Sequence, residues 1–199
     1  MKFKHIFTTI CPRRCDYCIT RNLKVPRRCD LDAVEHTYAA LASKGFDEIM
    51  ITGGEPTAAW HWVTISQMAG VFFERVHLTT ANHLALRQSS LFDSVTLSLH
   101  GRPAPPVGVG ISCPVYAAVM AREYNPRLPA KLEGLGYSGL LIAEDQRGED
   151  GFTLQHSHVV VSPGVSQDFT FKLNTRGVCM DVQILMPDLV LFPSFRDFL

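Results

Sequence analysis

The amino-acid sequence predicts an α/β fold: an incomplete (β/α)6-type, TIM-like barrel of mainly parallel strands with a short β-rich C-terminal extension. Strand-like and helix-like segments alternate with short connections over residues 1–145, which is typical of a parallel sheet covered by helices. Residues 146–199 lose the helical period and contain short apolar runs between turn residues. A complete eight-fold barrel usually needs about 250 residues, and this chain has 199. We therefore expect one domain, with a partial-barrel core at 1–145 and an extension at 146–199.

The N-terminal half of the chain predicts four strands separated by helices. Runs of β-branched, aromatic and other apolar residues place the strands at residues 3–10, 48–52, 75–80 and 94–100. After the first strand, apolar residues at three- and four-residue spacing predict a helix that begins near Asp30 or Asp32, as candidate N-caps, and ends at Gly45. Further helices are expected at residues 60–73 and around residues 84–86.

The C-terminal half departs from this regular alternation. A fifth strand is expected at residues 107–113, only six residues after the fourth, and six residues span at most about 20 Å. Such a strand is either parallel, after a return stiffened by prolines, or antiparallel. A helix at residues 114–124 and a sixth strand at 137–143 are expected to follow. Short strands at residues 159–161, 169–173, 182–186 and 189–192 predict an antiparallel extension over the open side of the barrel.

Composition excludes several classes of protein. Nineteen basic and nineteen acidic residues give zero formal net charge, so no general field for nucleic acid or membranes is expected. The mean hydropathy of +0.07 is that of a soluble globular protein, and we see no signal peptide or membrane span, so we expect a cytoplasmic location. Three of the six cysteines lie on one loop, which favours metal or cluster binding over disulfides.

The most informative pattern is C-x3-C-x2-C, formed by Cys11, Cys15 and Cys18 directly after the first strand. Three thiolates are one fewer than the four that a closed iron–sulfur or structural zinc site takes. A [4Fe–4S] cluster held by three cysteines leaves one iron open to another ligand, whereas a zinc site would need a histidine or Cys29 as its fourth ligand. A second motif, Gly-Gly-Glu-Pro at residues 53–56, follows after 34 intervening residues and ends the second strand.

On these two motifs the sequence resembles the radical S-adenosylmethionine (SAM) enzymes over roughly residues 5–145, as a small member with a reduced barrel. The resemblance implies a [4Fe–4S] cluster whose free iron is chelated by the amino and carboxylate groups of SAM. One electron would cleave SAM to methionine and a 5′-deoxyadenosyl radical, which abstracts hydrogen from a substrate in oxidoreductase- or lyase-type chemistry. It also implies an electron donor such as flavodoxin or ferredoxin.

The resemblance carries over to individual residues. The SAM amino group would be held by the strand end at Gly53, Gly54, Glu55 and Pro56. Tyr17 would lie near the adenine, with loop packing as the alternative. Polar contacts to the SAM ribose and carboxylate would come from Asn82 and Ser98, whose alternatives are a helix cap and a side chain facing the core.

Substrate contacts are expected from polar residues that follow the fourth and sixth strands: His100, Arg102, Glu144 and Asp145. Ligands of parallel α/β folds bind at the carboxyl ends of strands; the alternative is that these are solvated loop residues. The arginines of the cysteine loop could offset cluster charge or bind an anionic substrate, with a solvated basic loop as an equal alternative: Arg13, Arg14, Arg27 and Arg28. The sequence leaves open whether the substrate is a metabolite, a peptide or a protein. Two other functions also stay open: a non-catalytic zinc- or iron-binding module, and a radical SAM methyltransferase.

Overall fold

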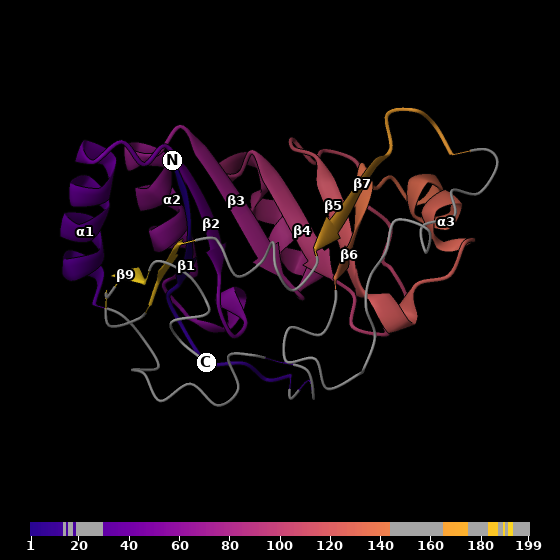
Figure 1. Cartoon of the computed structure of the whole chain (residues 1–199), viewed down its shortest axis with the longest axis horizontal. Coiled ribbons are helices and arrows are strands. Elements are labelled where there is room, and N and C mark those ends of the chain that lie inside the picture. The colour runs from indigo at the N-terminus through magenta and orange to yellow at the C-terminus, as the bar shows by residue number, and fades with distance from the viewer. Residues whose placement is uncertain are drawn as a thin grey trace.

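The computed structural model describes residues 1–13, 15, 18, 30–143, 165–174, 183–186, 189 and 191–192. Within this part of the chain, all strands belong to one open sheet with the order β7-β6-β5-β4-β3-β2-β1-β8-β9 (Figure 1). The strands are β1 (Lys2–Ile6), β2 (Glu48–Thr52), β3 (Arg75–Thr80), β4 (Ser94–Ser98), β5 (Val115–Met120), β6 (Gly139–Ala143), β7 (Thr170–Asn174), β8 (Gln183–Leu185) and β9 (Leu191–Phe192). Neighbours are parallel except for β8 and β9. The α/β class and the incomplete parallel barrel are therefore confirmed.

Helices connect these strands in the first two-thirds of the chain. They are α1 (Leu31–Ser43), α2 (Trp62–Phe72) and α3 (Leu128–Gly134), with the 3-10 helices η1 (Pro56–Ala58), η2 (His83–Leu91) and η3 (Ala121–Glu123). As expected, Asp30 caps α1, since its carboxylate accepts from Ala33 N–H, and Gly45 follows the helix with φ +86°. No helix in the described ranges is long and apolar enough to cross a membrane.

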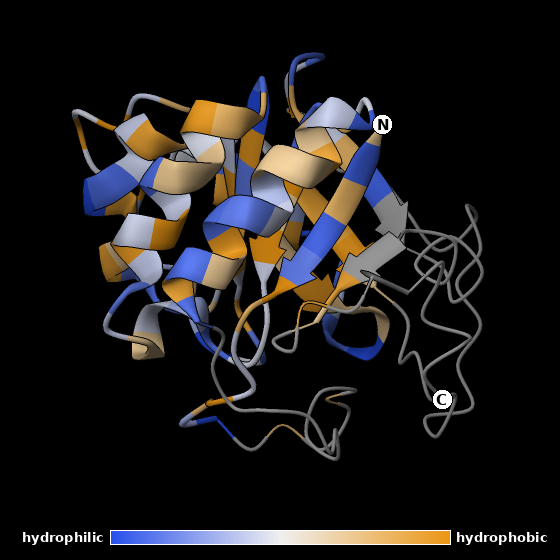
Figure 2. Cartoon of the chain, turned by 90° about the vertical axis from the view of Figure 1, so that its left-hand side faces the viewer, coloured by the Kyte–Doolittle hydropathy of each residue, from blue (hydrophilic) through white to orange (hydrophobic). Residues whose placement is uncertain are grey.

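Alternate residues of each strand face opposite sides of the sheet, and the main core lies on the helix side. The ring of Phe3 on β1 packs edge-on against Tyr38 of α1 and against Phe73, which directly follows α2. The residues that alternate with Phe3 along β1, such as Lys4, therefore face away from the helices, on the inner face of the sheet. Figure 2 shows that β1, which begins beside the N-terminus, carries both hydrophilic and hydrophobic residues.

His5 is a buried polar residue on the helix side of β1. Its Nδ1 lies 2.7 Å from the Tyr38 hydroxyl, and its Nε2 has no hydrogen-bond partner among the described residues. Burial lowers the pKa of His5 to about 3. The imidazole is therefore neutral in the folded protein over the whole physiological range.

This burial predicts a loss of stability in acid. Between pH 6.5 and 3 the unfolded chain binds a proton at His5 that the folded chain does not. Stability from the neutral imidazole is therefore complete above the unfolded pKa and falls as pH decreases. We expect a contribution of about 2 kcal/mol to be lost by pH 5. Urea titrations at several pH values should show that His5→Gln removes this part of the pH dependence, while His36→Gln, on the exposed surface of α1, retains it.

The expected fifth strand and the helix after it are corrected by the structure. Residues 107–113 are loop, and the segment expected to be helical contains β5, which is parallel to β4 and β6. The connection of residues 99–114 contains no helix, yet it is long enough for a parallel crossover. β5 is apolar on both faces. Val115, Ala117 and Val119 are buried against the helices, and the residues that alternate with them, Tyr116 and Ala118, face the other side of the sheet. Such a run has no strand periodicity, so it resembles a buried helix.

The extension was wrongly expected to be antiparallel. β7 pairs in parallel with β6, and β8 pairs in parallel with β1, so the extension lengthens the sheet at both edges. Only the β8–β9 pair is antiparallel among the described strands. The expected strand at residues 159–161 lies outside the described residues.

Candidate functional site

The two glycines that follow β2 pack against the backbone that leads from β1 to the first cysteine. Gly54 N–H donates to Thr8 O at 2.7 Å, and Glu55 N–H donates to Ile10 O at 2.8 Å. A Cβ atom at Gly53 would lie 2.5 Å from Thr8 O, and one at Gly54 would lie 2.5 Å from Ile10 O. Gly53 also has φ +147°, a conformation that favours glycine. Both glycines are therefore required for the close approach of two strand ends.

Glu55 joins the ends of β2 and β3 through its buried carboxylate. Its Oε1 accepts from Thr57 N–H at 3.1 Å, from the Thr57 hydroxyl at 2.8 Å and from the Thr80 hydroxyl at 2.5 Å. Its Oε2 accepts from Ala81 N–H at 2.7 Å. The carboxylate also caps η1, since it binds the helix N–H at Thr57. Glu55 is thus a positioning residue that holds three segments together at the carboxyl edge of the sheet.

Replacing this carboxylate should destabilise the protein. Glu55→Gln places an amide N–H₂ where an acceptor is needed, so a buried donor such as Ala81 N–H loses its partner. A loss of about 2 kcal/mol in the free energy of unfolding is expected for a hydrogen bond to a buried charged group. Urea unfolding measures the change. Glu35→Gln, which is exposed on α1, is the matched control and should change stability little. Equal stability of both variants would contradict the role assigned to Glu55.

Arg13 ties the cysteine loop to the ends of β3 and β4. Its Nη2 donates to Ala81 O after β3, and its Nη1 donates to Ser98 O at the end of β4, at 3.4 Å. Arg13 lies two residues after Cys11, so these contacts hold the start of the loop over the carboxyl ends of these two strands. The sequence offered Arg13 by its charge, together with Arg14, Arg27 and Arg28, which lie outside the described residues, but it did not indicate these carbonyl partners.

Cys11, Cys15 and Cys18 are half-buried and free of disulfides. Cys18 N–H donates to Cys15 O at 3.3 Å, which closes a turn between them. Burial raises the pKa of the Cys11 thiol; the Arg13 backbone N–H opposes this, and the charges of Cys18, Glu55 and Cys15 add to it. The three thiols therefore lie within electrostatic reach of one another, beside the Gly-Gly turn.

Soft thiolate ligands from one loop are the donor set that iron–sulfur clusters take, so the chemistry of the loop fits such a group. As placed, no three His, Cys, Asp or Glu side chains among the described residues are close enough to hold a metal ion. Cys29, the candidate fourth ligand of a zinc site, lies outside the described residues, as do Tyr17, Glu144 and Asp145.

Asn82 acts in the structure as a cap, which was its alternative reading. Its Oδ1 accepts from Leu84 N–H at the start of η2, and its Nδ2 donates to the Thr57 hydroxyl at 3.0 Å. Ser98 contributes its carbonyl oxygen to Arg13, as described, and its half-buried side chain belongs to the inner face of β4. Both residues lie at the carboxyl edge of the sheet, together with the Gly-Gly turn and the cysteine loop.

His100 and Arg102 follow β4 in a tight turn. Arg102 N–H donates to Leu99 O at 3.0 Å, and His100 and Gly101 both have positive φ, at 51° and 72°. Burial, and then the Arg13 charge, lower the pKa of His100. Arg102 is exposed and lines a hollow of about 160 Å³ that also includes Glu123. The turn thus brings His100 within reach of Arg13, while Arg102 borders a separate hollow.

Thr8 and Thr80 are site residues that sequence reasoning did not single out. The Thr8 hydroxyl accepts from Ile10 N–H at 3.1 Å, and the Thr80 hydroxyl donates to Glu55. Thr8 follows β1, and Thr80 ends β3. Each belongs to a pair of threonines at the end of a strand, Thr8-Thr9 and Thr79-Thr80, and this pair was the available sequence signal.

Comparisons with known proteins agree with this arrangement. Residues 5–102, just under half of the chain, match the family model described as the Radical SAM superfamily. GTP 3′,8-cyclase of Actinobacillus pleuropneumoniae is 28% identical over 99 residues, and that of Haemophilus ducreyi is 30% identical. Each alignment covers 46% of this chain and 28% of the relative, so the chain matches less than a third of those proteins.

Solved structures share the fold at low sequence identity. Streptococcus suis SuiB bound to its precursor peptide SuiA has a TM-score of 0.66 at 9% identity and covers 99% of this chain, which spans 60% of SuiB. SuiB bound to S-adenosylmethionine has a TM-score of 0.61 at 8% identity, covering 97% of this chain and 60% of SuiB. BtrN in complex with AdoMet and 2-DOIA has a TM-score of 0.53 at 15% identity, covering 99% of this chain and 74% of BtrN. Through residues 5–102, this chain is similar to the radical SAM superfamily.

Proposed function

We propose that this chain is a radical SAM enzyme whose [4Fe–4S] cluster is held by Cys11, Cys15 and Cys18. When bound, the reduced cluster supplies the electron that breaks the C5′–S bond of SAM, giving methionine and a 5′-deoxyadenosyl radical that takes a hydrogen atom from the substrate. An electron donor such as flavodoxin or ferredoxin would provide the reductant. The substrate is a small metabolite, a peptide or a protein segment.

The observation that carries this proposal is the way the cysteine loop is fixed at the strand ends. The Gly-Gly turn after β2 fixes the backbone directly before Cys11, and Arg13 ties the residues directly after it to β3 and β4. Three cysteines that form no disulfide therefore stand at the carboxyl edge of a parallel sheet, where α/β folds bind their ligands.

The residues of this chain would bind and orient SAM there. Backbone groups of residues 53–56 remain the candidates for the SAM amino group, with Tyr17 for the adenine. Glu55 acts through position, because four donors already occupy its carboxylate. Asn82 would contact SAM only by exchanging one of its present bonds to Leu84 or Thr57.

The test is anaerobic reconstitution with iron and sulfide, followed by dithionite and SAM. We expect a brown protein and the formation of 5′-deoxyadenosine with methionine, measured by chromatography. Formation of S-adenosylhomocysteine as well would indicate methyl transfer. A protein that retains zinc after purification, binds no SAM and forms no 5′-deoxyadenosine would overturn the proposal and support a metal-binding module.

A further inference from the structure

The inner face of the sheet, which turns away from the helices, is polar along its central strands. The residues of β3 and β4 with this orientation are Arg75, His77, Thr79, Ser94, Thr96 and Ser98. A closed parallel barrel normally fills this face with layers of Val, Ile and Leu. These polar residues are half-buried or exposed, so β3 and β4 give the inner face a polar surface suited to a polar ligand.

Tyr116, Gly139 and Lys172 form a cluster on this face, on the neighbouring strands β5, β6 and β7. Tyr116 is in register with Gly139, and Lys172 is in register with Leu141, two residues further along β6. A Cβ atom at Gly139 would lie 2.9 Å from Tyr116 Cδ1 and would also collide with the backbone of Thr170. The missing side chain therefore lets the Tyr116 ring extend across β6 towards β7.

The Tyr116 ring holds the Lys172 ammonium in place. Lys172 Nζ lies 4.5 Å from the ring centroid, which is cation–π geometry. A ring face attracts the charge but accepts none of the three ammonium N–H bonds in the way a carboxylate would. The ammonium is thus positioned in advance while its donors remain available to a ligand.

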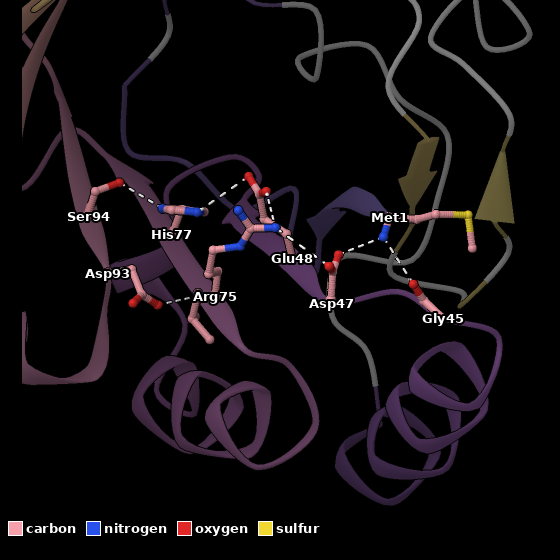
Figure 3. A network of polar contacts seen from close by, with 9 residues as sticks. Met1, Gly45, Asp47, Glu48, Arg75, His77, Asp93 and Ser94 are labelled. Carbon is pink, nitrogen blue, oxygen red and sulfur yellow. Dashed lines mark hydrogen bonds and ion pairs between the residues drawn. The ribbon is translucent and has the colours of Figure 1, made fainter.

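No carboxylate among the described residues forms an ion pair with Lys172. Glu48, on the same inner face, is already engaged: Arg75 Nη2 lies 3.3 Å from its Oε2, and His77 Nε2 lies 3.4 Å from its Oε1 (Figure 3). His77 also lies 2.8 Å from the Ser94 hydroxyl through Nδ1. Burial is the main cause that lowers the pKa of His77, and the Lys172 charge adds to it while Glu48 and Asp93 oppose it. The Lys172 charge therefore reaches His77 across the inner face, and no described carboxylate pairs with it there.

We propose that Lys172, positioned by Tyr116, binds an anionic group of the substrate, a carboxylate or a phosphate, on the inner face of the sheet. The inference rests on the proposed function and adds the chemical class of the substrate. A lysine ammonium is a compact point charge that suits either anion. Lys172 lies in the same transverse row as Ser98, three strands away, or at most about 14 Å along a flat sheet. A small anionic molecule could therefore reach from Lys172 to the strand ends that carry the cysteine loop.

The test reads the Lys172 ammonium directly. Reductive methylation with ¹³C labels lysines and retains their charge, and the resonance that disappears in Lys172→Arg identifies Lys172. Inorganic phosphate and acetate are titrated separately, each against sodium chloride at equal ionic strength. The Lys172 resonance should shift and saturate with phosphate, acetate or both, and the better anion identifies the group. The resonance of Lys131, exposed on α3, should not saturate.

Variants separate anion binding from a structural cation–π contact. Lys172→Met should weaken the affinity for the anion, measured by calorimetry, about tenfold, the size expected for a lost hydrogen bond to a charged group. Lys131→Met should not change this affinity. Tyr116→Phe retains the ring face and should bind like wild type, whereas Tyr116→Leu should bind more weakly. Wild-type affinity in Lys172→Met, or equal responses of Lys172 and Lys131, would overturn the inference. These measurements need neither cluster nor SAM, so failure here is distinguishable from failure to form 5′-deoxyadenosine.

Discussion

Replacing Cys15 with alanine is expected to abolish both the iron–sulfur chromophore and the formation of 5′-deoxyadenosine. A cluster already one ligand short of four protein thiolates would be left with two, and binding needs every remaining thiolate. After anaerobic reconstitution, iron and sulfide content should fall to background, and product formation from SAM and dithionite should fall with it. The Cys15 side chain is not part of the described apolar core, so folding measured by circular dichroism should be retained.

Cys113 supplies the matched control for this experiment. It is also half-buried and free, but it lies in the loop before β5, and burial raises its thiol pKa as it does for Cys11. Cys113→Ala should therefore retain the cluster and wild-type product formation. Undiminished 5′-deoxyadenosine in Cys15→Ala would show that the cluster assignment is wrong, and loss in both variants would show a general effect of removing thiols.

The Gly54→Ala substitution is expected to destabilise the fold by about 3 kcal/mol or more, the upper range for overpacking. Its Cβ atom would lie 2.5 Å from Ile10 O and 2.8 Å from Ile10 C and Thr9 C. These are backbone atoms, which cannot move aside as a flexible side chain can. The strain falls on the residue directly before Cys11, so we expect reduced cluster content as well as a lower urea midpoint.

Gly70 in α2 is the control for this substitution. A Cβ atom there meets nothing within 4 Å. Gly70→Ala should therefore stabilise the protein by up to about 1 kcal/mol, through helix propensity alone. The two Gly→Ala changes are thus expected to have opposite signs. If Gly54→Ala unfolds at the wild-type urea concentration and loads a full cluster, the close approach of the two strand ends does not constrain the site.

Local patterns were sufficient to predict several parts of this fold. Strand bounds at residues 48–52 and 75–80 match β2 and β3, because alternation and flanking turn residues are visible within a short window. The Asp30 cap and the Gly45 stop of α1 were also predictable, since a cap acts within one helical turn. By contrast, β5 carries apolar residues towards both faces and so has no local signature.

The candidate site divides in the same way. The cysteine spacing and the Gly-Gly-Glu-Pro segment could be recognised in the sequence, but the hydrogen-bond partners of Glu55 could not be predicted. Its carboxylate binds the Thr80 hydroxyl and Ala81 N–H, more than twenty residues away in the chain. Asn82, expected at the SAM site, caps η2 with one of its side-chain atoms, which is the alternative that the sequence also offered. Such partners depend on which strand ends lie side by side.

By itself, the sequence determined the α/β class, the cysteine loop and the likeness to the radical SAM superfamily, because periodicity and ligand spacing act within a few residues. Only the tertiary structure decided that β7 and β8 extend the sheet in parallel, that Arg13 fixes the loop to two strand ends, and that Lys172 meets Tyr116 across Gly139. The physical reason is that register and edge pairing join segments far apart in the chain, and no local pattern specifies which segments will meet.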